Sequence, residues 1–266
     1  MSFSSSHPHE RLGRDAGQRQ DGQTSDKMTR QTETRETVAA LLRALERKGS
    51  KRNRDGMARY GIVAKKVFGV SVETTRQLSK PHRKNHELAV ALWKTGWLEA
   101  RFVAGFIEDP AKLTSAQMDS WAKDFDNWAI CDHCCFHLFD KSPLGWKKVD
   151  QWARRKEEFV RRASFALVAS LAGHRKDAPD APFFRWLKLG ERYATDERNF
   201  VERAVSWAMR STGNRSYALH HAAMASAQRL AASPDSTARW IGRDVLRDLS
   251  RPIVAKRLSR RAPLLR

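Results

Sequence analysis

The chain has 266 residues, 41% of them hydrophobic, which is enough to bury a core in one large domain or in two tightly packed halves. Fifty Lys and Arg residues against thirty Asp and Glu residues give a formal charge of +20, which favours a polyanionic partner, nucleic acid first and anionic lipid second. No apolar stretch reaches the roughly eighteen residues of a spanning helix, and no signal peptide is visible, so we expect a soluble cytoplasmic protein without membrane contacts.

Residues 1–33 are polar and contain almost no large apolar side chain. Burial cannot offset the entropy of ordering such a segment, so we expect a disordered tail. Its charges balance, with five acidic and five basic residues. The excess positive charge therefore lies in the rest of the chain.

From residue 34 onward, apolar side chains recur at the i, i+3, i+4 and i+7 spacing typical of amphipathic helices. The first such stripe is Val38, Leu41, Leu42 and Leu45. Further helices, separated by short turns, are predicted for residues 71–78, 85–97, 99–107, 115–123, 125–139, 145–155, 157–172, 182–189, 199–211, 216–232, 236–249 and 252–260. No stretch alternates with period two for long, so the sequence predicts an all-α protein.

About a dozen short helices fit either a globular bundle or a solenoid of helical hairpins. Paired helices recur about every 35 to 45 residues, which favours a curved solenoid of HEAT-like or armadillo-like units. We expect one such domain over residues 34–250, with a concave basic face able to follow a DNA backbone, and a basic tail over residues 251–266.

One predicted helix places an aromatic side chain beside a carboxylate. Trp128 and Asp132 are four residues apart, so in a helix they project from the same face, one turn from each other. On a strongly basic chain, this pair is suited to stabilise positive charge on a sugar of a nucleic acid. The alternative is a half-buried helix whose Asp132 faces solvent or caps a neighbouring element.

Basic runs are the second candidate feature. They are Arg154-Arg155-Lys156, Arg161-Arg162, Arg175-Lys176 and Arg257 to Arg261. Each run lines the concave face or is only a solvated helix surface. Similarly, Trp207 is either part of a site or a core tryptophan, and Arg162 is either functional or a surface arginine.

Five stretches together resemble the AlkD-type DNA alkylation-repair glycosylases, over roughly residues 35 to 250. They are Met57-Ala-Arg-Tyr60, Val72-x-x-x-Arg76-Gln-Leu78, Asn127-Trp128-x-x-x-Asp132, Arg162-Ala, and Ala204-Val-Ser-Trp207-Ala-Met-Arg210. The resemblance implies HEAT-like repeats and removal of cationic alkylated bases, such as 3-methyladenine and 7-methylguanine, from double-stranded DNA. It also implies a monomer that acts in the cytoplasm, associated with the nucleoid.

The same resemblance implies roles for individual residues. Asp132 matches the catalytic aspartate, Trp128 and Trp207 match the aromatic pair around the deoxyribose, and Arg162 matches an arginine on the phosphate-binding side of the cleft. Further expected DNA-binding residues are Arg154, Arg155, Arg161 and Arg210. A cationic purine is already a good leaving group, so the expected reaction needs no metal, no cofactor and no general acid.

Two features depart from the family pattern or compete with it. Cys131 stands where relatives more often have a branched apolar residue, and the linker around residues 174–180 is longer. Cys131, Cys134 and Cys135 with His137 also resemble part of a zinc site, but ligands on one straight helix do not easily surround a tetrahedral ion. We expect buried thiols and no metal.

Two other classes of function remain open. A non-catalytic HEAT-like DNA-binding or scaffold protein would share the basic groove, but has no reason to keep Trp128, Asp132, Arg162 and Trp207 together. An RNA-binding helical repeat would present base-reading or stacking side chains once per repeat, and no such pattern is visible.

Overall fold

The computed structural model describes the backbone of residues 12–260 and the side chains from Met28 to Arg260. Every regular element in this part of the chain is helical, which confirms the predicted fold class. The helices are α1 (Leu12–Arg47), α2 (Lys51–Arg59), α3 (Val72–Ser79), η1 (Lys80–His82), α4 (His86–Lys94), α5 (Leu98–Ile107), α6 (Ser115–Lys123), α7 (Trp128–His137), η2 (Phe139–Lys141), α8 (Leu144–Ala153), α9 (Glu158–His174), α10 (Ala181–Arg192), α11 (Asn199–Gly213), α12 (Tyr217–Ala231), α13 (Ser236–Leu249) and α14 (Pro252–Ser259).

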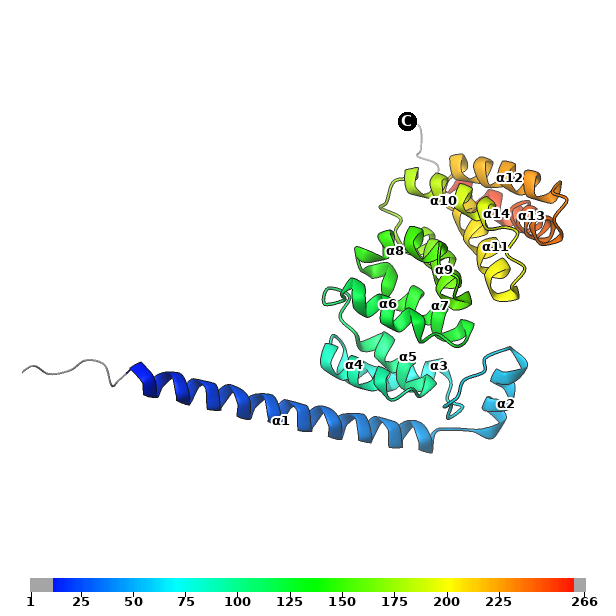
Figure 1. Ribbon diagram of the computed structural model, residues 1–266. Helices are drawn as coiled ribbons and strands as arrows, with labels where there is room; N and C mark the ends of the chain where they lie inside the picture. The colour runs from blue at the N-terminus through cyan, green and yellow to red at the C-terminus, as the bar shows by residue number, and fades with distance from the viewer. Residues whose placement is uncertain (1–11, 261–266) are drawn as a thin grey trace, which may run out of the picture.

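The helices form a curved stack of hairpins (Figure 1). The second helix of each hairpin packs on the second helix of the next, so that α5, α7, α9, α11 and α13 form one continuous layer. The first helices α4, α8 and α12 pack on their own partners in the other layer. This arrangement is a solenoid, and it brings together side chains that are 30 or more residues apart in the sequence.

Local sequence signals explain most helix boundaries. Thr114 caps α6 and Asp235 caps α13, in each case by accepting a hydrogen bond from the backbone amide three residues later. Both helices have the predicted bounds. In α7 the side chain of Asn127 accepts hydrogen bonds from two backbone amides, so the helix begins at Trp128, three residues after the predicted start.

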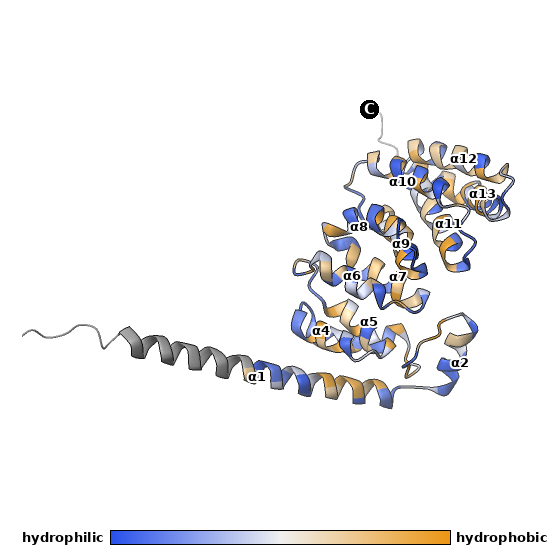
Figure 2. Ribbon diagram, in the orientation of Figure 1, coloured by the Kyte–Doolittle hydropathy of each residue, from blue (hydrophilic) through white to orange (hydrophobic). Residues whose placement is uncertain are grey.

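Helix α1 begins inside the segment expected to be a disordered tail. It is helical from Leu12, whereas residues 1–11 lie outside the described part of the chain. Its last turns bury Leu41 and Leu45 against α4 and α5. In Figure 2 the coloured part of α1 becomes more apolar toward its C-terminal end. Packing of this end against the stack nucleates the helix. Each further polar residue then joins it at a small cost in free energy, because it adds one backbone hydrogen bond.

Helix α2 was not predicted, because its sequence has no apolar stripe and none of its residues is buried. Hydrogen bonds hold it in place instead. Asn53 donates to the carbonyl oxygen of Gly69 at 3.0 Å, and Arg54 donates to that of Phe68 at 2.9 Å. The carboxylate of buried Glu99 accepts hydrogen bonds from the backbone amides of residues 68–70. It thereby holds in place the segment to which α2 donates its hydrogen bonds.

The described residues continue in a packed helix beyond the expected domain boundary at residue 250. Helix α14 follows it and buries Val254 and Leu258, which are 2% and 1% exposed, in the core. These two residues are four apart and lie on one face of the helix. The segment was expected to be a tail because its many basic residues dominate its composition and hide this apolar pair. The folded unit therefore extends at least to Ser259, and residues 261–266 lie outside the described residues.

None of the helices within residues 12–260 combines the length and apolar character required to cross a bilayer.

Candidate active site

Helix α7 positions the predicted pair. Trp128 is its first residue and Asp132 lies one turn later on the same face, as the spacing predicts. Cys131 and Cys135, each three residues after one member of the pair, lie on the adjoining side of the helix, where Cys131 Sγ donates to the carbonyl oxygen of Phe159 and Cys135 Sγ to that of Ala163, both at 3.5 Å. The thiols therefore dock α7 onto α9 and leave Asp132 directed into the concave side.

Asp132 forms a two-pronged ion pair with Arg162 of α9. Nε of Arg162 donates to Oδ1 of Asp132 at 2.8 Å, and Nη2 donates to Oδ2 at 2.7 Å. The third guanidinium nitrogen, Nη1, donates to the carbonyl oxygen of Phe200 at 2.7 Å. Arg162 is only 6% exposed, so the interpretation of Arg162 as a surface arginine is wrong.

The ion pair controls the charge of the site. Burial raises the pKa of Asp132 above its ordinary value, whereas the positive charge and hydrogen bonds of Arg162 lower it. Burial also lowers the pKa of Arg162, but the charge of Asp132 outweighs it and the pKa rises. Arg162 thus favours the carboxylate form of Asp132, which burial away from water disfavours.

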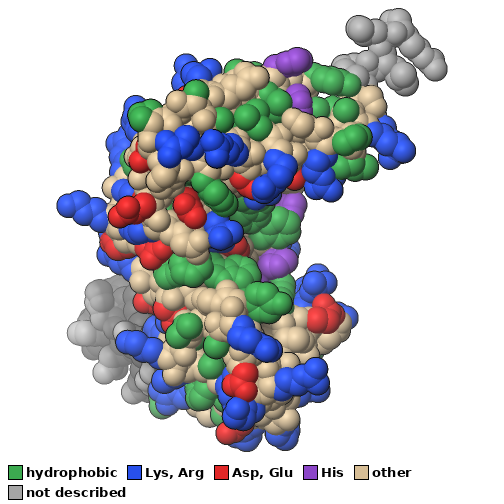
Figure 3. Space-filling view, turned by 90° about the vertical axis from the view of Figure 1, so that its right-hand side faces the viewer, with side chains coloured by type: hydrophobic (Ala, Val, Ile, Leu, Met, Phe, Trp, Pro, Cys, Tyr) green, Lys and Arg blue, Asp and Glu red, His purple; other side chains and the backbone are tan. Residues whose placement is uncertain are grey.

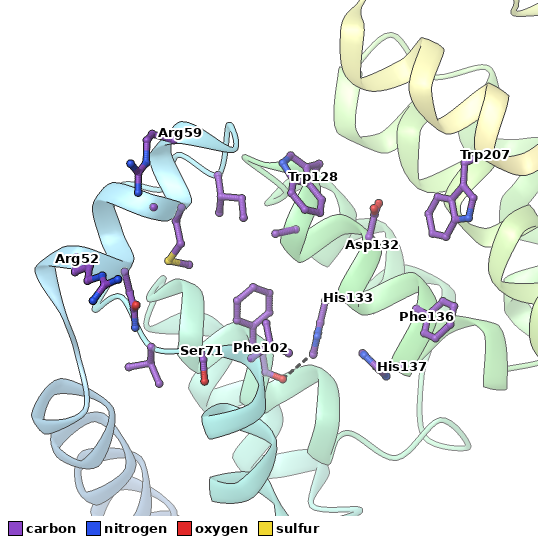
Figure 4. Close-up of a pocket in the computed structure, with 17 residues that line it drawn as sticks. Arg52, Arg59, Ser71, Phe102, Trp128, Asp132, His133, Phe136, His137 and Trp207 are labelled. Carbon is purple, nitrogen blue, oxygen red and sulfur yellow. Dashed lines mark hydrogen bonds between the residues drawn. The ribbon is translucent and has the colours of Figure 1, made fainter. Parts of the chain in front are cut away.

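The two predicted tryptophans flank this carboxylate. Figure 4 shows Asp132 between the indole rings of Trp128 and Trp207, with Trp207 projecting from α11. Nε1 of Trp128 donates to the carbonyl oxygen of Tyr60 at 2.9 Å, and the guanidinium carbon of Arg162 lies 6.0 Å from the centroid of the Trp128 ring. Trp207 is half-buried: it packs against the core and also borders open space, so it is not a fully buried core residue.

Two hollows open on either side of Asp132 and Trp207. The larger hollow, about 600 Å³, lies between α2, α3, α7 and Trp207, and its floor includes Phe102 and His133. The smaller hollow, about 430 Å³, lies between α9, α11 and α13. Figure 3 shows this face of the molecule, with apolar and histidine side chains in the hollowed middle and Lys and Arg above and below.

The histidines of the larger hollow are neutral at neutral pH. Complete burial lowers the pKa of His133 to about 3, and a ring nitrogen of its imidazole is 2.9 Å from the carbonyl oxygen of Phe102. Partial burial and the nearby Lys141 lower the pKa of His137 to about 4. The floor of the hollow is therefore aromatic and uncharged beside the carboxylate of Asp132, and the charged Arg52 and Arg59 line the hollow from α2.

The predicted DNA-binding arginines do not form one cluster. Arg210 borders the smaller hollow together with Asp132 and Arg162. Arg161 faces another side, where it donates to Asp196 at 2.5 Å. Arg154 and Arg155 are exposed at the turn between α8 and α9, and Arg155 is paired with Glu157.

Sequence analysis missed several residues of the site. The smaller hollow is lined by Arg203 and Trp240, whose guanidinium carbon and ring centroid are 5.6 Å apart. Arg203 stands four residues before Trp207, the spacing that identified Trp128 and Asp132, so this signal was available. Arg52 and Arg59 of α2 border the larger hollow and were missed together with that helix.

The cysteine cluster does not form a metal site in the described residues. Cys131, Cys134 and Cys135 are buried, unpaired thiols, and no group of three His, Cys, Asp or Glu side chains there is arranged to hold an ion. Burial raises the pKa values of Cys134 and Cys135 well above the ordinary value, so both remain neutral thiols. In this structure Cys131 and Cys135 pack against α9, and Cys134 lies near Gly105 of α5.

Comparison with known proteins identifies the family. The model of the DNA alkylation repair enzyme family matches residues 41–249. A solved structure described as a new family of proteins related to the HEAT-like repeat DNA glycosylases with affinity for branched DNA structures is similar over 79% of this chain and 94% of its own, with a TM-score of 0.67 and 20% sequence identity. This similarity confirms the predicted HEAT-like fold. A comparison with curated proteins gave no match. Because the family model spans the stack from the end of α1 to the end of α13, the chain belongs to the DNA alkylation repair enzyme family.

Proposed function

We propose that this protein is a DNA glycosylase that hydrolyses the N-glycosidic bond of cationic alkylated purines, 3-methyladenine and 7-methylguanine, in duplex DNA. The observation that carries the proposal is the single carboxylate of Asp132 between the faces of Trp128 and Trp207, on the concave side of a basic solenoid. We propose that it acts as a monomer in the cytoplasm, on nucleoid DNA.

The chemistry follows from the charge of the lesion. When the bond from C1′ to an alkylated purine breaks, the bonding electrons leave with the base, which departs neutral, and positive charge develops on the sugar. The carboxylate of Asp132 stabilises that charge by electrostatics, and the two indole faces add cation–π attraction. No general acid is required, because the base already carries the charge that protonation would supply.

Water completes the reaction. Each oxygen of Asp132 accepts one hydrogen bond from Arg162, and a carboxylate oxygen has a further lone pair, so Asp132 can also orient a water molecule toward C1′. The water oxygen bonds to C1′, and one water proton passes to the carboxylate and then to solvent. Burial of Asp132 raises its pKa, which favours this proton transfer, whereas the charge and hydrogen bonds of Arg162 lower the pKa and so favour the carboxylate form before the reaction.

The test is release of 7-methylguanine and 3-methyladenine from methylated duplex DNA, with EDTA present and absent. We expect release that is unaffected by EDTA and lost in Asp132→Asn, whereas duplex binding persists. The matched control is Asp150→Asn, an aspartate on α8 that pairs with Arg185 at 2.7 Å away from the site. Full release by Asp132→Asn would refute the proposed role of this carboxylate.

A second candidate is structure-specific DNA binding without excision. It is favoured by the similar solved structure, whose description mentions affinity for branched DNA structures. Binding of four-way junctions much more tightly than duplex, with no release of either methylated purine, would support this second function against the first. The joint presence of Asp132, Arg162 and both tryptophans in one site favours the glycosylase.

A further inference from the structure

The turn that follows α2 carries the most exposed large apolar side chain among the described residues. We call residues 60–63 the tip. Tyr60 is 77% exposed and Val63 is 66% exposed, and only Met28, at 65%, comes close to them. Single exposed apolar residues are ordinary, but two on one turn beside a functional site indicate an interaction surface.

Hydrogen bonds hold the backbone of the tip, whereas the side chains of Tyr60 and Val63 are exposed. The carbonyl oxygen of Tyr60 accepts the hydrogen bond of the Trp128 indole at 2.9 Å, so the tip is tied to the candidate active site. The amides of residues 61 and 62 donate to carbonyl oxygens of α2 at 2.9 and 3.0 Å. Gly61 has φ = +72°, and a Cβ there would lie only 3.3 Å from Cζ of Phe200, so the close approach to α11 requires glycine.

Positive charge surrounds the tip. Arg59 precedes it, Lys65 follows it, and Arg52 lies further back on α2, all of them exposed. This pattern of apolar side chains with cationic neighbours fits duplex DNA, which has anionic phosphates outside and an apolar stack of bases inside. A protein partner with an apolar pocket would not by itself require the cations.

We propose that the tip is a wedge that enters the base stack of duplex DNA, next to the nucleotide whose sugar faces Trp128. The ring of Tyr60 replaces a stacking neighbour, Val63 fills the groove beside it, and the flanking cations bind the phosphates. Because unstacking is easiest where pairing is already weak, the wedge directs the protein to mismatches, nicks and branch points. The proposal depends on DNA binding but not on excision.

The test uses unmodified duplexes that carry 2-aminopurine beside a mismatch, so no glycosylase activity is needed. The full-length protein should raise the 2-aminopurine fluorescence on binding. Tyr60→Ala should remove this rise and weaken binding to the mismatched duplex by about tenfold, the order expected of one lost base–aromatic stack. Tyr60→Phe should behave as the unmodified protein, because the ring stacks and the backbone carbonyl that holds Trp128 is retained.

The matched control is Tyr217→Ala, an exposed tyrosine at the start of α12, at the far end of the stack from α2 (Figure 1). It should leave fluorescence and affinity unchanged. An unchanged fluorescence rise in Tyr60→Ala would overturn the proposal, as would a loss in Tyr60→Phe equal to that in Tyr60→Ala. If both Tyr60→Ala and Val63→Ser bind every duplex normally, the tip does not enter DNA and the proposal is overturned.

Discussion

Arg162 donates hydrogen bonds to both carboxylate oxygens of Asp132 and, through its third nitrogen, to the carbonyl oxygen of Phe200. The arginine therefore links α7, α9 and the start of α11, three successive helices of the inner layer. Its role in this structure is to position the carboxylate. The contact with DNA phosphate that the family resemblance implies for Arg162 remains a prediction.

Replacing Arg162 should destabilise the protein strongly. Arg162→Met leaves the carboxylate of Asp132 buried without its partner, and we expect a loss of about 3 kcal/mol in the free energy of unfolding, measured in urea. Arg185→Met, which removes an exposed arginine from a surface pair with Asp150, should cost less than about 1 kcal/mol. Similar losses in the two variants would show that the Asp132 pair behaves as an ordinary surface pair.

Trp128 should contribute through both its ring and its indole nitrogen. Trp128→Phe keeps an aromatic face but loses the hydrogen bond to Tyr60, so excision of 7-methylguanine should fall roughly 5- to 10-fold. Trp128→Ala loses the face as well and should fall roughly 100-fold. Trp146→Phe, in a ring stack with Trp186 away from the hollows, serves as the control and should retain activity. Equal rates for the Phe and Ala variants of Trp128 would contradict a role for the ring.

Arg203 should bind a phosphate although sequence analysis missed it. It lies over the ring of Trp240 at the edge of the smaller hollow, where it is exposed. Arg203→Ala should weaken duplex binding and reduce the slope of log affinity against log salt by about 0.9, the value for one released counterion. The control is Arg229→Ala, which removes an exposed arginine of α12 that pairs with Glu191 of α10, and it should leave the slope unchanged. An unchanged slope in Arg203→Ala would place the DNA elsewhere.

Acid should destabilise the fold through His133. Burial lowers its pKa from 6.5 to about 3 in the folded protein, so protons bind the unfolded chain more tightly. The part of the free energy of unfolding that depends on neutral His133 is fully present above pH 6.5. It is lost as the pH falls toward 3, and the free energy of unfolding decreases by about 1.4 kcal/mol per pH unit within that window. Urea unfolding between pH 7.5 and 4.5 measures the slope. His133→Gln should flatten it, and the exposed His221→Gln should not.

Helix α14 should be required for stability. Leu258→Ala should reduce the free energy of unfolding by about 2 to 4 kcal/mol, because it empties a core position. Ile253→Ala, on the same helix but 48% exposed, should cost less than about 1 kcal/mol. If Leu258→Ala unfolds at the same urea concentration as the unmodified protein, the chain beyond residue 250 is a tail after all.

The sequence by itself determined what depends on neighbours along one helix. Apolar periodicity located nearly all the helices, capping residues such as Thr114 and Asp235 fixed their ends, and the spacing of Trp128 and Asp132 put both on one face of α7. These features are local, because a helix repeats every 3.6 residues whatever surrounds it.

Only the tertiary structure decided which helices meet. The partnership of Arg162 with Asp132 spans 30 residues, and the hydrogen bond from Trp128 to Tyr60 spans 68. Helix α2 has no buried residue and exists because other segments accept its hydrogen bonds. Such contacts depend on how successive hairpins are stacked, and that stacking arises from the packing of whole helix faces, which no local spacing in the sequence encodes.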